Sequence, residues 1–238
     1  EAPGNYWTKE AGEPAAAELT FLIDDAGERV VEAFRLEGNG LEVEASARFA
    51  ADGRILSAEV PRLFVDGFIE TGLSVSRTGE DERLTLLAEG QYFNATGLFT
   101  DVLDSTGEGG AAPPLAIDVR LDRVNSTETS VYEEVTLAWR SDGAGNDSLI
   151  VTGEAPDGQF TAQMTGTGLG EMRRFWIEAP NFGRMLQIFG LYENVDGGVL
   201  RLEGALPPPG ETGTTNLRVE AGNFTLVRMP VLARILAA

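Results

Sequence analysis

The stretch of sequence that decides the fold runs from Met172 to Leu206 and reads MRRFWIEAPNFGRMLQIFGLYENVDGGVLRLEGAL. It begins with the strand-forming residues Phe175–Ile177, and Pro180 ends that strand because its ring fixes φ and it has no N–H to donate. The next apolar residues are spaced i, i+3, i+4 and i+7, which places them on one helical face: Phe182, Met185, Leu186 and Phe189. This spacing predicts a short amphipathic helix over Phe182–Leu191, which Gly190 allows to end.

The rest of this stretch predicts a turn and a second strand. Asp196-Gly197-Gly198 has the composition of a tight turn. In Val199–Glu203, Leu200 and Leu202 alternate with mixed or charged residues, so one face of the strand is apolar. The whole unit is therefore predicted to be strand, short helix, turn and strand.

The same alternation of apolar and polar residues recurs along the chain. Leu41–Phe49 is the clearest half-buried strand of the first half, and Leu115–Asp122 repeats the pattern in the second half. Glycine-containing turns separate such strands roughly every 12 to 18 residues, and Pro61 predicts a bulge or a strand end. Two further short helices are expected, over Thr96–Leu103 and Met229–Ala238. The predicted fold is mainly β: a long curved antiparallel meander sheet, folded over or sandwich-like, with two or three short amphipathic helices.

One stretch, Ser105–Pro114, has the composition of a linker. We therefore expect an N-terminal β-meander part over residues 1–104 that ends in a short helix, a linker over 105–114, and a C-terminal β part over 115–238 with two short helices. A single continuous sheet is the alternative. The chain starts at Glu1 without a methionine and stops inside an expected helix, which suggests a piece of a longer protein.

Composition excludes several classes of function. The chain has 18 Lys and Arg against 38 Asp and Glu, so its formal net charge of -20 repels nucleic acid. It has no cysteine and no histidine, which rules out disulfides, thiolate or histidine zinc sites, and catalytic triads that need these residues. We expect no catalytic residues, no metal site and no cofactor.

The residues quoted above resemble a known family. The strand Phe175–Ile177, the helix Phe182–Leu191, Gly197-Gly198 and the tail Phe224–Leu236 resemble the C-terminal part of the AsmA-like envelope proteins, especially the YhdP branch. Gly90–Phe99 resembles the glycine, short loop and helix start of that family, although Asn94 replaces its usual aspartate. The resemblance covers most of the chain from about residue 80 onward and contains no catalytic signature.

AsmA-like proteins are built from a long U-shaped β-sheet, anchored at one end in the inner membrane, whose hydrophobic groove is thought to carry phospholipids across the periplasm. The resemblance implies that this chain is a non-catalytic, periplasmic segment of such a bridge between the inner and outer membranes of a Gram-negative cell envelope, acting in outer-membrane lipid homeostasis. The partners it implies are phospholipid acyl chains, the remainder of a longer membrane-anchored chain, and other envelope proteins. The candidate lipid-groove residues are the alternating apolar ones: Leu41, Val43, Leu115, Ile117, Val119, Leu149, Val151, Phe160, Met164, Leu200, Leu202, Leu217 and Val219.

Three other interpretations stay open. Each apolar strand residue, taken singly, is more often core than ligand lining. The chain as a whole fits a β-rich scaffold or adhesin-like module that binds protein partners through its edges. An enzyme acting on glycans is kept for its neighbouring carboxylates, such as Glu133-Glu134 and Glu80-Asp81-Glu82.

Overall fold

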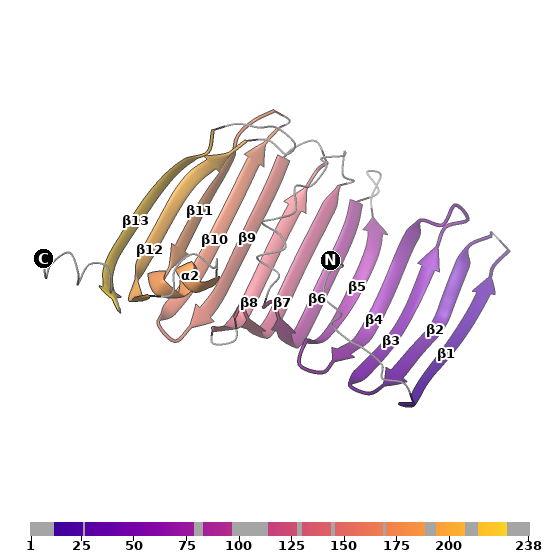
Figure 1. Cartoon of the computed structure of the whole chain (residues 1–238). Coiled ribbons are helices and arrows are strands. Elements are labelled where there is room, and N and C mark those ends of the chain that lie inside the picture. The colour runs from indigo at the N-terminus through magenta and orange to yellow at the C-terminus, as the bar shows by residue number, and fades with distance from the viewer. Residues whose placement is uncertain are drawn as a thin grey trace, which may run out of the picture.

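The computed structural model describes residues 12–25, 27–78, 83–96, 114–127, 130–143, 146–168, 170–188, 194–207 and 214–227. These residues form one sheet of thirteen strands and one short helix (Figure 1). The first six strands are β1 (Ala15–Ile23), β2 (Arg29–Gly38), β3 (Leu41–Phe49), β4 (Ile55–Val65), β5 (Ile69–Thr78) and β6 (Arg83–Asn94). The others are β7 (Leu115–Asn125), β8 (Val131–Ser141), β9 (Asn146–Ala155), β10 (Gly158–Thr167), β11 (Arg173–Ala179), β12 (Val195–Leu206) and β13 (Asn216–Leu226), with helix α2 (Phe182–Ile188) between β11 and β12.

The strands lie in the sheet in the order in which they occur in the chain. Every neighbouring pair is antiparallel except β6 and β7, which are parallel. The prediction of a mainly β, largely antiparallel meander is therefore confirmed. The sheet is neither closed nor strongly curled, and within the described ranges there is no second sheet facing it, so neither the expected folded-over shape nor the expected sandwich-like packing is found there (Figure 1).

Short glycine turns join several of the antiparallel neighbours. Gly40 and Gly53 have φ values of 67° and 88°, in the left-handed region that glycine adopts at no steric cost. In the second of these turns the Gly53 N–H donates to Ala50 O at 2.9 Å. Because such turns connect strands adjacent in sequence, they account for the sequential strand order.

Pro61 lies in a bulge, as predicted. The register between β4 and β5 shifts between Val60 and Leu63, so the proline falls where the hydrogen-bond ladder is already interrupted. A similar shift occurs in β8 between Glu133 and Thr136, where Glu134 has a φ of 49°. The bulges allow long strands to stay paired while their twist changes.

The predicted turn at Asp196-Gly197-Gly198 is wrong. These residues belong to β12, in which Asp196 pairs with Thr225 and Gly197 with Phe224 of β13. Gly197 and Gly198 have φ values of 65° and 85°, so they form an irregular segment within a strand. A Cβ on Gly198 would lie 2.6 Å from the Cβ of Phe224, so the glycine is needed for the close approach of these two strands.

The amphipathic helix is confirmed over Phe182–Ile188 and begins after Asn181, whose side-chain oxygen accepts the Arg184 N–H at 2.9 Å. The predicted continuation through Phe189 to Leu191 lies outside the described residues, as do residues 97–113 and 228–238. The expected helix over Thr96–Leu103, almost all of the expected linker and the expected C-terminal helix fall in these ranges.

The core is small for a chain of this length. Its one buried cluster among the described residues consists of Ala179, Met185 and Leu200, under α2. The chain exposes 15257 Å² of surface, whereas a compact monomer of 25.4 kDa is expected to expose about 10,300 Å². In the described ranges only α2 covers part of the sheet, so most of the sheet is a single layer.

Candidate functional site

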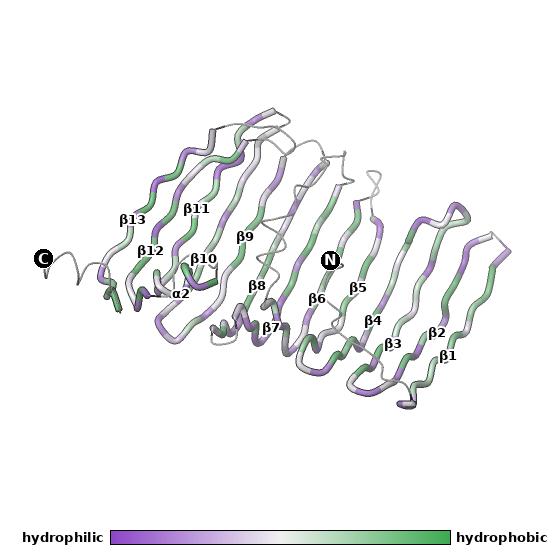
Figure 2. The backbone as a smooth tube through the Cα atoms, viewed as in Figure 1, coloured by the Kyte–Doolittle hydropathy of each residue, from purple (hydrophilic) through white to green (hydrophobic). Residues whose placement is uncertain are grey.

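The strand register places apolar side chains from all thirteen strands on one face of the sheet. Residues opposite each other in neighbouring strands point to the same side, so a face can be followed from pair to pair. One row across four strands runs through Ile117, Trp139, Leu149 and Met164. We call the side of the sheet that carries this row, Leu41 and Leu200 the apolar face, and the side that carries Glu42, Asp118 and Arg201 the polar face. Figure 2 shows hydrophobic and hydrophilic residues alternating along the strands.

All thirteen candidate groove residues lie on the apolar face. They differ in how much of each side chain is covered. Leu41 and Leu200 are buried, whereas Leu217 and Val219 at the edge of the sheet are 58% and 56% exposed. The other nine are half-buried. The register thus brings the candidate residues together on one surface, which crosses the expected domain boundary because β6 and β7 are hydrogen-bonded neighbours.

Three of the candidates pack under α2. Leu200 belongs to the buried cluster, and Phe160 and Leu202 contact it. Figure 1 shows α2 lying across the end of the sheet formed by β10–β12. At this end the apolar face is a conventional small core.

The prediction from the sequence missed some apolar residues that lie on the same face. Leu19, Phe21 and Ile23 of β1 are 63%, 50% and 63% exposed, more than any of the thirteen except Leu217 and Val219. Trp139 of β8 also lies on the apolar face and is 36% exposed. The signal that identifies them is the same alternation with period two, which is present in both segments of the sequence.

The polar face carries ion pairs between neighbouring strands, together with some exposed apolar side chains such as Leu87 and Ile150. Arg120 Nη1 lies 2.7 Å from Glu89 Oε1, and Arg140 Nη2 lies 2.7 Å from Asp118 Oδ1. Arg201 Nη2 lies 3.3 Å from Glu178 Oε1. These side chains are solvent-exposed, so each pair contributes little to stability. The charged groups keep the polar face hydrated, whereas the apolar face is poorly hydrated.

Where the register is regular, the charged residues of the apolar face lie at the ends of strands. Arg29, Arg77, Asp147 and Arg173 are all at the margin where β1 ends and β2 begins. Arg77 donates from Nε to the carbonyl oxygen of Ile55 at 2.9 Å, along this margin. The middle of the face is therefore lined by hydrocarbon, with Thr71 as a polar exception whose hydroxyl bonds to backbone carbonyls.

Two hollows of about 400 and 420 Å³ open on the polar face. The first lies over Gly72 and is lined by Glu59, Glu89 and Arg120, and the second is lined by Glu18, Glu32 and Arg35. Apolar residues such as Phe34, Leu73 and Leu87 also line these hollows, but their charged groups must be desolvated when hydrocarbon covers them. The middle of the apolar face has no such charges.

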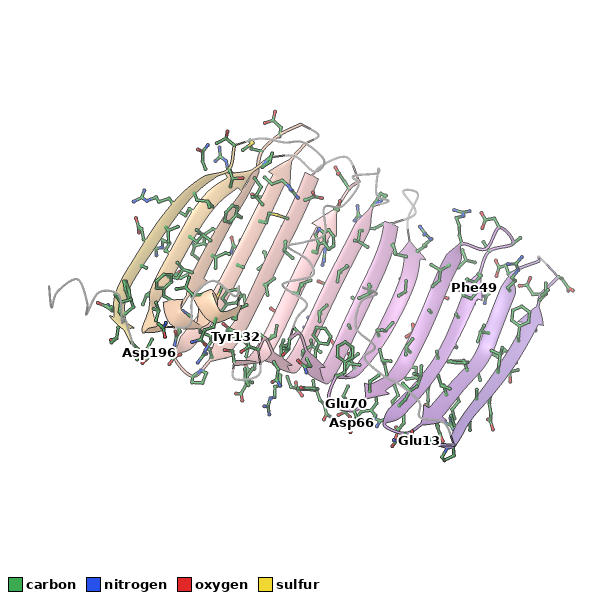
Figure 3. The ribbon with its side chains drawn as sticks, in the orientation of Figure 1. Glu13, Phe49, Asp66, Glu70, Tyr132 and Asp196 are labelled. Atoms are coloured by element: carbon green, nitrogen blue, oxygen red, sulfur yellow. The ribbon has the colours of Figure 1, made fainter. Side chains whose placement is uncertain are left out.

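A small polar cluster fixes α2 to the sheet. Arg184 lies 3.1 Å from Asp157 in the turn between β9 and β10, and the Asn181 amide donates to the same carboxylate at 2.8 Å. Beside this cluster lies Tyr132, near α2 (Figure 3). The Tyr132 hydroxyl lies 3.9 Å from the sulfur of Met185, and the centroid of the Tyr132 ring lies 5.6 Å from that of the Phe160 ring. Burial raises the pKa of Tyr132, and nearby Arg184 partly offsets this.

Other kinds of site need groups that the described residues do not bring together. Within the described ranges no three His, Cys, Asp or Glu residues gather in a way that could hold a metal ion. No helix in those ranges has both the length and the apolar character needed to cross a membrane. Glu133 faces Glu154 across the strand pair, and Glu80-Asp81-Glu82 lies outside the described residues. Comparison of the sequence with models of known protein families and with curated proteins finds no match.

Proposed function

We propose that this protein is a non-catalytic module that binds lipid acyl chains on the apolar face of its sheet. The observation that carries the proposal is the continuity of that face: apolar side chains in register across thirteen strands, with charges confined to one margin where the register is regular. Monomeric soluble proteins rarely expose apolar patches beyond a few hundred Å² without a binding role. A lipid is an occupant that needs no directional bonds from such a surface.

The dimensions suit hydrocarbon chains. Thirteen strands about 4.8 Å apart make a sheet about 58 Å wide, and a ten-residue strand spans about 33 Å. A bilayer leaflet, half of a hydrocarbon core about 30 Å thick, is roughly 15 Å deep, so extended acyl chains fit on the face. Each buried methylene contributes about 0.8 kcal/mol without fixing the position of the chain along the face. Such binding retains a lipid and lets it slide.

The resemblance to AsmA-like envelope proteins supports a more specific role. In that role the chain is a periplasmic segment of an inner-membrane-anchored bridge protein, and its sheet is one wall of a folded-over groove that moves phospholipids between the two membranes. The bulges in β4 and β8 are positions where strands can bend toward such a shape. Other strands of a longer protein, or the lipid itself, then cover the apolar face.

Bound lipid is the direct test. Organic-solvent extraction of protein purified without detergent is expected to release phospholipid in roughly stoichiometric amount, and the delipidated protein is expected to take up a fluorescent fatty acid. Protein that carries no lipid and takes up no probe contradicts the proposal.

A matched pair of variants in β9 tests which face of the sheet binds the lipid. Leu149 lies on the apolar face and Ser148 on the polar face, and both are half-buried. Leu149→Asn is expected to weaken fatty-acid uptake several-fold, because the amide must be desolvated when hydrocarbon covers it. Ser148→Asn is the control and is expected to bind as the unmodified protein does. Equal loss in both variants would place the binding elsewhere.

A scaffold or adhesin-like module is the second candidate. It is favoured by the two outer strands of the described sheet, β1 and β13, each of which pairs on one side only. Partners then add along the backbone of these strands and not on the apolar face. A protein without lipid whose partner binding is lost when β1 carries a proline would support this candidate over the lipid module.

A further inference from the structure

The two outer strands of the described sheet, β1 and β13, both carry exposed apolar side chains on the apolar face. Leu19 of β1 and Leu217 and Val219 of β13 are 63%, 58% and 56% exposed, and all three lie on the apolar face. The single parallel pair, β6 and β7, changes the alternation of strand directions once. Because of this parallel pair, β1 and β13 run in opposite directions. In a sheet of thirteen strictly alternating strands, the first and last strands would run in the same direction. Placed edge to edge, β13 of one molecule and β1 of the next therefore form an antiparallel pair.

The charges that β1 and β13 carry on the polar face are complementary as well. A row across the first four strands runs through Arg62, Glu44, Arg35 and Glu18, which are opposite one another in register and alternate in sign. At the other edge Arg218 of β13 is opposite Glu203 of β12. If Glu18 is placed opposite Arg218, the alternation of sign continues across the junction without interruption. Opposite charges directly across a strand pair are favourable, and like charges are not.

We propose that a second copy of this chain pairs its β1 with β13 of the first, so that molecules join head to tail into one extended sheet. Register with Glu18 opposite Arg218 also places Leu19 opposite Leu217 and Ala17 opposite Val219 on the apolar face. A shift by two residues in one direction places Glu18 opposite Glu220, which is unfavourable, and a shift in the other direction places it opposite the uncharged Asn216. Because the interface is heterologous and the sheet is not strongly curled, the assembly is an open row. The row lengthens the apolar face, but its formation does not depend on lipid binding.

A charge swap tests the junction. Sedimentation velocity over a wide range of protein concentration is expected to show reversible association of the unmodified protein. Glu18→Arg and Arg218→Glu each place like charges at the junction and are expected to weaken association roughly three- to tenfold. The double variant E18R/R218E restores the opposite pair and is expected to restore association. Glu178→Arg is the matched control, because Glu178 lies on the same face in β11, inside the sheet, and it is expected to associate normally.

A cross-link tests the register. The chain has no cysteine, so disulfides form only where cysteines are introduced. In the proposed register Thr20 lies opposite Asn216, within the distance that a disulfide spans. Oxidised T20C/N216C is expected to give a ladder of covalent oligomers, and T20C/G222C, which is out of register, is expected not to. A protein that remains monomeric at every concentration, or a folded double swap that fails to restore association, overturns the proposal.

Discussion

At the scale of single residues, the ionisation of Tyr132 makes the free energy of unfolding depend on pH. Its hydroxyl is covered by α2, and burial raises its pKa above the value of about 10 that it has in the unfolded chain. Stability from the neutral hydroxyl is fully present below pH 10 and is lost as pH rises through the folded pKa. We expect the free energy of unfolding, measured in urea at successive pH values, to fall more steeply above pH 10 in the unmodified protein than in Tyr132→Phe. Parallel curves for the two proteins would contradict this.

A second prediction at this scale concerns Gly90 of β6. A Cβ there would lie 2.4 Å from the carbonyl oxygen of Glu70 and 2.5 Å from the Cα of Thr71, in the backbone of β5. Gly90→Ala is expected to cost about 1–3 kcal/mol of unfolding free energy, because the backbone must shift. Gly222 of β13 is the control, since a Cβ there meets nothing within 4 Å. Thermal unfolding of G222A is expected to change little or to shift slightly upward, and an unaffected G90A would be inconsistent with the strand spacing.

At the scale of elements, α2 is the one described helix and covers one end of the apolar face. Met185 is 4% exposed and contacts Ala179 and Leu200. Met185→Ala is expected to cost about 2 kcal/mol or more of unfolding free energy in urea, through lost burial and the cavity left behind. Gln187→Ala, on the exposed side of the helix, is expected to stay within about 0.5 kcal/mol. If α2 restricts access to β10–β12, M185A also takes up more fluorescent fatty acid than Q187A.

At the scale of the whole molecule, the open sheet buries less surface on folding than a compact protein does. A compact monomer of this size buries about 72% of the surface of its unfolded chain, whereas the described part of this chain is one sheet with one short helix over it. The urea m-value scales with the surface exposed on unfolding. We expect an m-value lower than that of compact proteins of equal length, measured by circular dichroism. Saturating fatty acid is expected to raise the denaturation midpoint, because it binds only the folded sheet.

The sequence by itself determined the class of fold and the faces of the strands. Alternation with period two in segments such as Leu41–Phe49 is a local property, so it predicts strands and their apolar side without knowledge of neighbours. The bulge at Pro61 and the helix after Asn181 are local for the same reason. The thirteen candidate residues were found in this way, and the residues of β1 follow from the same rule.

Only the tertiary structure decided how these pieces are joined. The sequence pattern contains no information on whether β6 and β7 are parallel, because that pairing joins segments separated by a long connection. The glycines of β12 have the composition of a turn, and only their pairing with Phe224 and its neighbours shows them to lie inside a strand. Whether an apolar strand residue is core or open surface depends on what lies above it, which is why Leu200 under α2 and Leu217 at the edge differ although their local patterns are alike.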